Sequence, residues 1–356
     1  MAKRMEVAIV GGGPAGSSLA IALGRRGVPV VLFEKARHPR LKPCGEGLLP
    51  PGVQALQRLV GLPPAPRVRG VRFSAGDASV EADFPSHSGL VVRRDRFDAW
   101  LFDLAASTPN VDARPATPYR GEPASLVVGA DGVRSMFHRR LPPAPAERPR
   151  RVGLSTHVAG IERLGDRVEV YFHDEGELYV APTGDGEALV SALFDYQHFR
   201  RDGVTYLIDK TPALRDRAQR IELTTPLLAS GPLGLEVPRL VDSTRRLLLV
   251  GDAAGTPDPI TAGGLSLVLT ATELAADAIV TGDLQHYEKE RRRMGRTARR
   301  LGRLLLWLGR SERRAAFVLR ELSPLVPRLL DVALRSETVS ASERRDPSGV
   351  GVARRV

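Results

Sequence analysis

The sequence predicts an α/β protein with three parts: a domain on a parallel, Rossmann-like sheet, a domain on an antiparallel sheet, and a C-terminal helical region. The first part is predicted by an apolar run, Glu6–Val10, that leads through a glycine-rich turn into the helix-like segment Ala15–Arg25, as in strand–turn–helix units of parallel sheets. The second is predicted by segments between residues 151 and 194 in which apolar and polar residues alternate. The third is predicted by Arg299–Arg310, where leucines and arginines recur at helical spacing.

Length and composition limit the function classes. At 356 residues, 42% of them hydrophobic and 26% charged, the chain has room for one large core and a smaller unit. No apolar run approaches the roughly 18 residues of a membrane-spanning helix, and Met1–Met5 precede a strand without the apolar region of a signal peptide. We therefore expect a soluble, cytoplasmic protein. The single cysteine, Cys44, can form neither an intramolecular disulfide nor a cysteine-rich metal site, so we expect no structural metal.

The net charge of +11 is concentrated near the C-terminus. Residues 286–335 contain 14 Lys or Arg and 5 Asp or Glu, a net charge of +9, whereas residues 1–285 carry +1. Because the excess is confined to one segment and lysine is scarce along the whole chain, we expect no nucleic-acid partner. Three interpretations of this amphipathic segment stay open: a helical cap with a solvated arginine face, docking to a membrane surface, and self-association.

The glycine-rich turn Gly11–Gly16 has the G-x-G-x-x-G arrangement of a dinucleotide-binding site. Gly11 permits the tight turn, Gly13 lets the backbone approach a pyrophosphate, and Gly16 lets the helix pack close to the strand. A second strand ends at Glu34, 21 residues beyond Gly13, where a carboxylate accepts hydrogen bonds from a ribose hydroxyl. The contacts expected here are Gly11, Gly13, Pro14, Ala15, Gly16, Glu34 and Lys35.

A second motif ends the strand Leu247–Val250 in Gly-Asp and continues to the pair Gly263 and Gly264. At this point the sequence resembles the flavoprotein superfamily of geranylgeranyl reductases, flavin-dependent halogenases and group A monooxygenases of the p-hydroxybenzoate hydroxylase fold. The resemblance implies FAD as the cofactor and an FAD-binding domain of the GR2 type. It also implies that Asp252 holds the ribityl and pyrophosphate side of FAD, and that a helix N-terminus stabilises negative charge on the flavin. The residues implied in this segment are Gly251, Asp252, Pro259, Gly263, Gly264 and Leu265.

A third motif, Val127–Ser135, contains the Asp-Gly pair of the same superfamily. There the aspartate, Asp131 here, helps to hold FAD and influences the transient docking of NAD(P)H, which the resemblance implies as the reductant. Arg94 matches an arginine that contacts the flavin or its phosphates in the family. A solvated arginine at the start of a helix is the alternative for this residue.

The segment Lys42–Leu48 resembles the geranylgeranyl reductases more closely than the hydroxylases. In those proteins a Cys-Gly-Glu sequence lies beside the isoalloxazine ring, which implies Cys44 and Gly45 as cofactor contacts and Cys44 and Glu46 as catalytic candidates. The alternative for Cys44 is a small buried apolar role. The halogenase branch is disfavoured, because the chain lacks its Trp-x-Trp-x-Ile-Pro motif and has no lysine between Lys42 and Lys210.

Seven segments predict the sheet of the second domain: 68–73, 79–84, 89–92, 151–158, 167–172, 177–181 and 188–194. The candidate substrate pocket comprises His157, Tyr171, Tyr179 and Phe194, but a one-residue change of register would turn each side chain to the other face. Tyr179–Pro182 lies where prenyl reductases carry Tyr-x-Trp-x-Phe-Pro, and only the proline and one aromatic remain. This departure weakens the case for a prenyl substrate.

The motifs divide the chain into four parts. We expect a discontinuous FAD-binding domain at 1–65, 94–140 and 241–285, a substrate domain at 66–93 and 150–240, basic helices at 286–335 and a disordered tail at 336–356. Only 37 residues separate Arg94 from Asp131, so we expect the small β-meander that relatives carry there to be reduced to a turn.

The sequence thus predicts an FAD-dependent oxidoreductase that uses NAD(P)H and acts on a small apolar or aromatic substrate, such as a quinone or polyketide. Hydroxylation with O2 is favoured over reduction of a double bond in a prenyl or polyene chain, because the prenyl-reductase motif is degraded. A flavin-binding electron carrier without its own turnover is a further alternative. We expect a cytoplasmic monomer or homodimer, in peripheral contact with the inner face of the membrane if the basic helices dock there.

Overall fold

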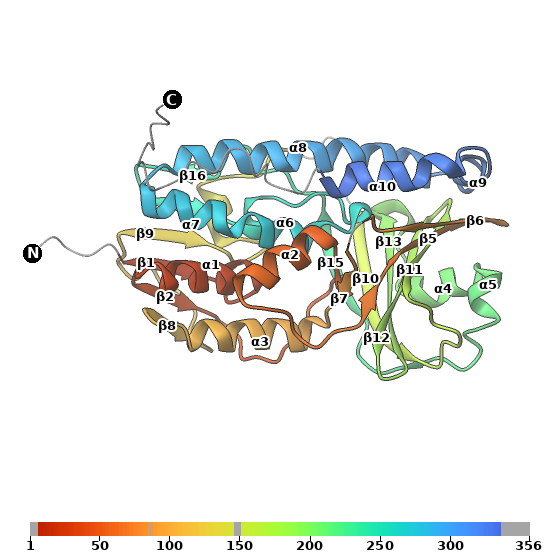
Figure 1. The fold of residues 1–356 in the computed structure, drawn as a ribbon, viewed down its shortest axis with the longest axis horizontal. Coiled ribbons are helices and arrows are strands. Elements are labelled where there is room, and N and C mark those ends of the chain that lie inside the picture. Colours follow the sequence, from red (N-terminus) through yellow and green to blue (C-terminus); the bar gives the residue numbers. More distant parts are fainter. Residues whose placement is uncertain (1–5, 86, 146–150, 336–356) are drawn as a thin grey trace, which may run out of the picture.

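The computed structural model describes residues 6–85, 87–145 and 151–335, and the predicted tail lies outside them. Two large sheets occupy the two halves of the molecule, and a layer of helices runs along one side of both (Figure 1). Helices α1 (Pro14–Arg25) and α3 (Arg94–Ala106) pack against the first sheet, and the long helix α8 (Leu284–Gly309) extends from the first half to the second. The predicted α/β fold class is confirmed.

The first sheet is parallel apart from one edge strand. Its order is β16 (Val241–Asp242), β17 (Leu247–Leu249), β9 (Leu126–Gly129), β1 (Val7–Val10), β2 (Val30–Phe33) and β8 (Val111–Arg114), with β16 antiparallel. Val10 is paired with Phe33 on one side and with Gly129 on the other, and Gly129 is paired with Leu249. The carboxyl ends of four strands are therefore level, and all three sequence motifs follow strands at the same edge.

Helix α1 starts unusually close to β1. A Cβ atom at position 16 would lie 1.8 Å from the backbone oxygen of Gly11, so this packing requires glycine. Helices α2 (Pro50–Leu59), α6 (Gly264–Thr270) and α7 (Thr272–Thr281) complete this half. No strand lies between Arg114 and Leu126, all of which the structure describes, and the chain crosses there as a loop.

The segment Gly264–Thr281 consists of two helices, α6 and α7, which meet at Ala271. It also has the length and mean hydropathy, 1.4 over 18 residues, of a membrane span, so the expectation that no segment approaches this length was wrong. Because 61% of the segment is buried inside the protein, it is weak evidence for a span.

The second sheet has the order β14, β10, β13, β12, β11, β5, β6, and β15 also pairs with β10. The strands are β5 (Gly70–Ala75), β6 (Ala78–Asp83), β10 (Arg151–Ala159), β11 (Arg167–His173), β12 (Gly176–Gly184), β13 (Glu187–Asp195), β14 (Glu222–Leu223) and β15 (Leu228–Leu233). All neighbours are antiparallel except β5 and β11. The predicted strand at 89–92 does not join this sheet, because β7 (Gly89–Val91) pairs instead with β3 (Gly47–Leu48) and β4 (Arg67–Val68).

The two faces of the second sheet have different neighbours. The outer face packs against α4 (Gly203–Asp209) and α5 (Pro212–Arg215) around a core that includes Tyr171 and the fully buried Phe194. The inner face meets the first domain and the C-terminal helices, and it carries Tyr179 and His157. Because side chains alternate along a strand, Tyr171 and Phe194 are directed away from His157 and Tyr179.

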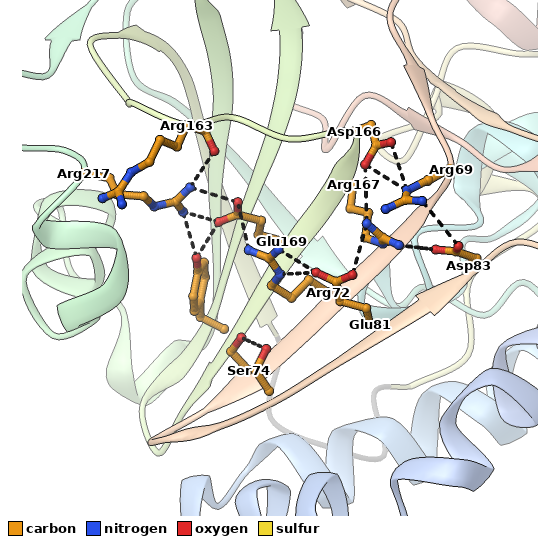
Figure 2. A network of polar contacts seen from close by, with 12 residues as sticks. Arg69, Arg72, Ser74, Glu81, Asp83, Arg163, Asp166, Arg167, Glu169 and Arg217 are labelled. Atoms are coloured by element: carbon orange, nitrogen blue, oxygen red, sulfur yellow. Dashed lines mark hydrogen bonds and ion pairs between the residues drawn. The ribbon is translucent and has the colours of Figure 1, made fainter.

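A polar network joins β5, β6 and β11 near the edge of this sheet (Figure 2). Its buried centre is Glu169, which accepts hydrogen bonds from the Arg217 guanidinium and from the Tyr171 hydroxyl. Arg72 links Glu169 to Glu81. Burial, and then the Glu169 carboxylate, raises the pKa of Tyr171, so its hydroxyl stays a donor within the fold.

The C-terminal helices α8, α9 (Glu312–Glu321) and α10 (Val326–Arg335) cover the inner face. Leu306, Leu319 and Val326, one from each helix, pack against Val170 and Phe172 of β11. The helix predicted at Arg299–Arg310 and the basic helices predicted over 286–335 are therefore present.

A buried ion cluster connects this sheet to the loop that precedes α6. Arg151 of β10 contacts Glu177, Asp258 at 2.7 Å and Asp195 at 3.5 Å, and Asp195 also binds Arg310 of α8 at 2.9 Å. Three carboxylates thus share two guanidinium groups. Burial, opposed by Arg151, raises the pKa of Glu177 to about 7, so the surplus carboxylate holds its proton below about pH 7.

We expect Glu177 to make stability depend on pH. Between its ordinary pKa of 4.5 and the native value of about 7, the folded protein holds a proton that the unfolded chain has lost. The free energy of unfolding should therefore fall as pH rises through this window, by at most about 3 kcal/mol. Urea unfolding at pH 5 and pH 8 should show this fall in wild type and in Glu162→Gln, an exposed control, but much less in Glu177→Gln. An equal fall in the free energy of unfolding in wild type and in Glu177→Gln would contradict this role of Glu177.

Candidate active site

The glycine-rich turn is fixed by the carboxylate of Glu34. Gly11 has a φ of +112°, and a Cβ atom there would lie 2.4 Å from the Ala130 oxygen. Glu34 is buried and accepts hydrogen bonds from the N–H groups of Gly12 and Ala36, both at 2.8 Å. The carboxylate thus stands between the turn and the end of β2, while the neighbouring Lys35 is exposed.

The fold itself does not require glycine at position 13. Its backbone is extended, with φ −79° and ψ −173°, which any residue adopts. A Cβ atom there would meet only the Arg40 guanidinium, at 4.0 Å. Positions Gly45 and Gly264 are equally open, with no atom of the described chain within 4 Å of a built Cβ. The open space at the start of α1 is what a closely approaching ligand requires.

Two buried polar groups beside this edge are left unpaired. Oδ1 of Asp131 has no hydrogen-bond partner in the described part of the chain, although Oδ2 accepts from Met136 N–H at 2.8 Å. Nε of Arg40 is also without a hydrogen-bond partner among the described residues. Because buried polar groups are normally satisfied, both atoms point to a ligand at the edge. Arg40 lies in no recognisable sequence motif.

The second motif closes the edge from the other side. Gly251 has a φ of +61°, and a Cβ atom there would lie 2.5 Å from that of Ala15. Asp252 follows it in the short helix η3 (Gly251–Ala254), whereas Pro259, Gly263 and Leu265 lie on the segment that leads into α6. Burial, and then Arg94, lowers the pKa of Lys42, opposed by Asp252 and Asp98. Lys42 was also missed as a site residue.

A small cavity lies where the segment after β2 meets the inner face of the second sheet. It brings together Cys44, Glu46, Arg94 and His157, which the sequence predicted separately. Its other lining residues are Leu41, Lys42, Asp95, Ser155, Thr156, Leu189, Thr225 and Leu228. The cavity is thus apolar at three leucines and polar around Cys44 and Glu46.

Glu46 is the centre of the polar side. Its φ of +56° is costly for a residue with a side chain, and its carboxylate is buried. One oxygen accepts a hydrogen bond of 2.8 Å from the backbone N–H of Arg94. The other oxygen lies 2.9 Å from Nε2 of His157. Nδ1 of His157 lies 3.2 Å from the hydroxyl of Thr225, a residue for which the sequence offered no signal.

Arg94 is a buried member of this site, which contradicts the alternative of a solvated arginine. Its guanidinium binds Asp98 through two hydrogen bonds of 2.7 and 2.8 Å. Burial alone would lower the pKa of Arg94, but Asp98 and the Cys44 sulfur hold it well above its ordinary value. The sulfur of Cys44 also accepts the Glu46 N–H at 3.3 Å. A fixed positive charge therefore lies beside the only thiol.

The other predicted pocket residues lie elsewhere. Tyr171 and Phe194 belong to the core of the outer face, and neither lines the cavity. Tyr179 is on the inner face but packs under the C-terminal helices, with a buried hydroxyl that has no partner among residues the structure describes. Of the four candidates, only His157 reaches Cys44 and Glu46, because strand register decided the face of each side chain.

Comparison with known proteins gives consistent matches. A family described as FAD binding domain matches residues 4–62. Digeranylgeranylglycerophospholipid reductase 2 of Methanothermobacter thermautotrophicus is 26% identical over 83% of this chain and 86% of that protein. Menaquinone reductase of Mycolicibacterium smegmatis is 28% identical over 81% of this chain and 79% of that protein.

Solved structures share the fold at lower identity. A geranylgeranyl bacteriochlorophyll reductase-like protein from Thermoplasma acidophilum superposes with a TM-score of 0.77 at 22% identity, covering 95% of this chain and 96% of that one. The halogenase PltM, in complex with phloroglucinol and FAD, gives a TM-score of 0.74 at 15% identity, covering 95% and 87%.

The match over residues 4–62 and the similarity to these reductases over most of the chain agree with the FAD-dependent oxidoreductase that the sequence motifs predicted. The described residues fit this cofactor. The start of α1, with Gly13 and Arg40, would hold the pyrophosphate, Glu34 would hold a ribose hydroxyl, and the unpaired oxygen of Asp131 would receive a further hydrogen bond.

We expect Gly13→Val to weaken FAD binding at least about tenfold, or ~1.4 kcal/mol, without unfolding the protein. The backbone and the surrounding protein tolerate a side chain there, so only the cofactor would be obstructed. Gly165→Val is a matched control, because position 165 is exposed and equally open. Fluorescence titration with FAD and the melting temperature of the apoprotein measure the two effects. Unchanged FAD affinity in Gly13→Val would contradict this placement of the cofactor.

Proposed function

We propose that this protein is an FAD-dependent reductase that uses NAD(P)H to saturate a carbon–carbon double bond in an isoprenoid chain. The observation that carries the proposal is a cavity in which a thiol, a guanidinium and a carboxylate–imidazole pair meet. Such groups supply and hold a proton, which a reduction needs. The names of the relatives, a digeranylgeranylglycerophospholipid reductase and menaquinone reductases, support the same class of reaction.

Reduction of the double bond divides into the delivery of two electrons and the delivery of a proton. Reduced FAD, when bound, supplies a hydride equivalent to one carbon. The other carbon takes a proton from the protein, so that NAD(P)H, one proton and the alkene become NAD(P)⁺ and the saturated chain. The chain's own residues must therefore place a proton donor at the cavity.

Cys44 is the proton donor in this proposal. Its sulfur accepts the Glu46 N–H and lies beside Arg94, and no hydrogen bond donated by the thiol is present among the described residues. The S–H proton is free to face a substrate in the cavity. The Arg94 charge stabilises the sulfur anion that remains, and solvent returns the proton after turnover.

Glu46 and His157 position this donor. The carboxylate of Glu46 is held by His157 and by the start of α3, which fixes the Glu46 N–H against the sulfur. His157 has both ring nitrogens engaged, by Glu46 and Thr225, so it has no free donor for a substrate.

Hydroxylation of an apolar or aromatic substrate is the second candidate. One observation favours it: of the prenyl-reductase motif only the proline and one aromatic remain at Tyr179–Pro182, and Tyr179 packs under the helices. Reduction adds two hydrogen atoms to the substrate, whereas hydroxylation adds one oxygen atom. A single measurement of the product mass therefore distinguishes the two reactions.

We expect the FAD-loaded enzyme with NAD(P)H to add two hydrogen atoms to a double bond in the isoprenoid chain of menaquinone, measured after any quinol is reoxidised to the quinone, or of a digeranylgeranyl lipid, also without oxygen. Mass spectrometry of the extracted lipid measures this. Cys44→Ala should lower turnover about 10²-fold or more and leave FAD occupancy unchanged. Addition of one oxygen atom, only in aerated buffer, would overturn the proposal in favour of hydroxylation.

We expect His157→Gln to lower turnover as well, because Glu46 loses its partner. His173→Gln is the matched control: His173 is also buried and also lies 2.9 Å from a threonine hydroxyl, that of Thr211, but it is outside the cavity. Turnover should stay near wild type in this variant. Equal losses in both variants would mean that His157 acts only through stability.

A further inference from the structure

The C-terminal helices expose an unusual share of the large apolar side chains. Of the fourteen large apolar residues that are exposed in the described chain, seven lie between residues 304 and 332, in α8, α9, α10 and the turn between the last two. The most exposed of these seven are Phe317 at 60%, Val332 at 59% and Trp307 at 55%. These helices lie together along one side of the molecule (Figure 1), so the seven residues belong to one layer of helices.

These side chains are not an unfinished part of the core. The inward sides of the same helices are already buried through Leu306, Leu319 and Val326, which pack on the inner face of the second sheet. Leu334 at the end of α10 packs into a further cluster. The helices are therefore apolar on both sides, whereas a helix that only covers a sheet has a polar outward side.

Unpaired positive charge accompanies the exposed apolar residues. Arg300, Arg303, Arg313 and Arg328 are exposed, and no ion pair joins any of them to an acidic side chain within the described residues. Arg314 stacks over the Trp307 ring, with its guanidinium carbon 4.6 Å from the ring centroid. Apolar side chains beside arginines, on a segment with a net charge of +9, match the interface of an anionic bilayer.

We propose that this side of α8, α9 and α10 docks on an anionic lipid surface. A second copy of the chain would bring two surfaces of like charge together. A nucleic acid would leave exposed aliphatic residues such as Leu325 and Leu329 without apolar neighbours. A bilayer with anionic headgroups satisfies both features, because arginines bind the headgroups while the apolar side chains enter the boundary of the acyl region.

Docking would place the active-site cavity close to the lipid. Leu334 of α10 packs in the same cluster as Leu189, which lines the cavity beside His157. One helix thus separates the docking surface from the site. The inference does not depend on the proposed reaction, because it concerns only where the protein binds.

The test uses the full chain loaded with FAD and vesicles of phosphatidylcholine, with or without phosphatidylglycerol. We expect co-sedimentation with the anionic vesicles at low salt and a marked loss as salt rises, since the screening length shrinks to about 8 Å at physiological ionic strength. The variant Phe317→Ser/Val332→Ser should bind at least about tenfold more weakly. Arg303→Gln/Arg328→Gln should weaken binding to anionic vesicles.

The matched control is Leu223→Ser/Leu227→Ser, which removes two exposed apolar side chains, 51% and 39%, from β14 and the segment after it, at the opposite edge of the sheet from β6, where α9 and α10 pack. It should bind vesicles like wild type. In a Trp100→Phe background, the emission of Trp307 should shift to shorter wavelength on anionic vesicles.

Three results would overturn docking. They are no sedimentation at low salt, equal binding by the Phe317→Ser/Val332→Ser variant and wild type, and a Trp307 shift that follows protein concentration without vesicles, which would indicate self-association. Turnover of a short, water-soluble alkene by the Phe317→Ser/Val332→Ser variant tests the proposed reaction without any need for docking on lipid. That turnover should equal wild type whether or not docking is correct.

Discussion

Glu46 joins the three segments on which the active site depends. Its carboxylate accepts the backbone N–H at the start of α3 and contacts His157 on β10, and its backbone N–H donates to the Cys44 sulfur. A positive φ at Glu46 is the cost of this arrangement, and the buried hydrogen bonds offset it. Because these partners come from both large domains, Glu46 also fixes the second sheet against the first.

Buried arginines form further ion pairs that hold parts of the structure together. Arg94 is paired with Asp98 beneath the cavity, Arg151 links the second sheet to the loop before α6, and Arg217 holds Glu169 within the sheet. Arginine suits these positions, since its planar group binds two or more acceptors and stays charged when buried. Each pair would be costly to break, because an uncompensated charge would remain in the interior.

The cofactor edge and the substrate side of the site follow different rules. The edge is built from strand ends and backbone groups. These depend on the fold, which this chain shares with a solved reductase-like protein and a solved halogenase. The substrate side is built from side chains of the inner face, which differ from one protein to another on the same fold. The reaction is therefore argued from Cys44, Arg94, Glu46 and His157, and the cofactor from the turn at Gly11–Gly16 and Glu34.

The sequence by itself determined the features that depend on local order. Strand, turn and helix follow one another within a few residues, so the cofactor motifs, six of the eight strands of the second sheet and the C-terminal helices were predictable. Only the tertiary structure decided which side chains meet. Glu46 and His157 are 111 residues apart, and neither Thr225 nor Arg40 belongs to a motif. The face taken by Tyr171 and Phe194 was set by pairing between strands, because the side-chain period of two turns a one-residue difference in register into the opposite face.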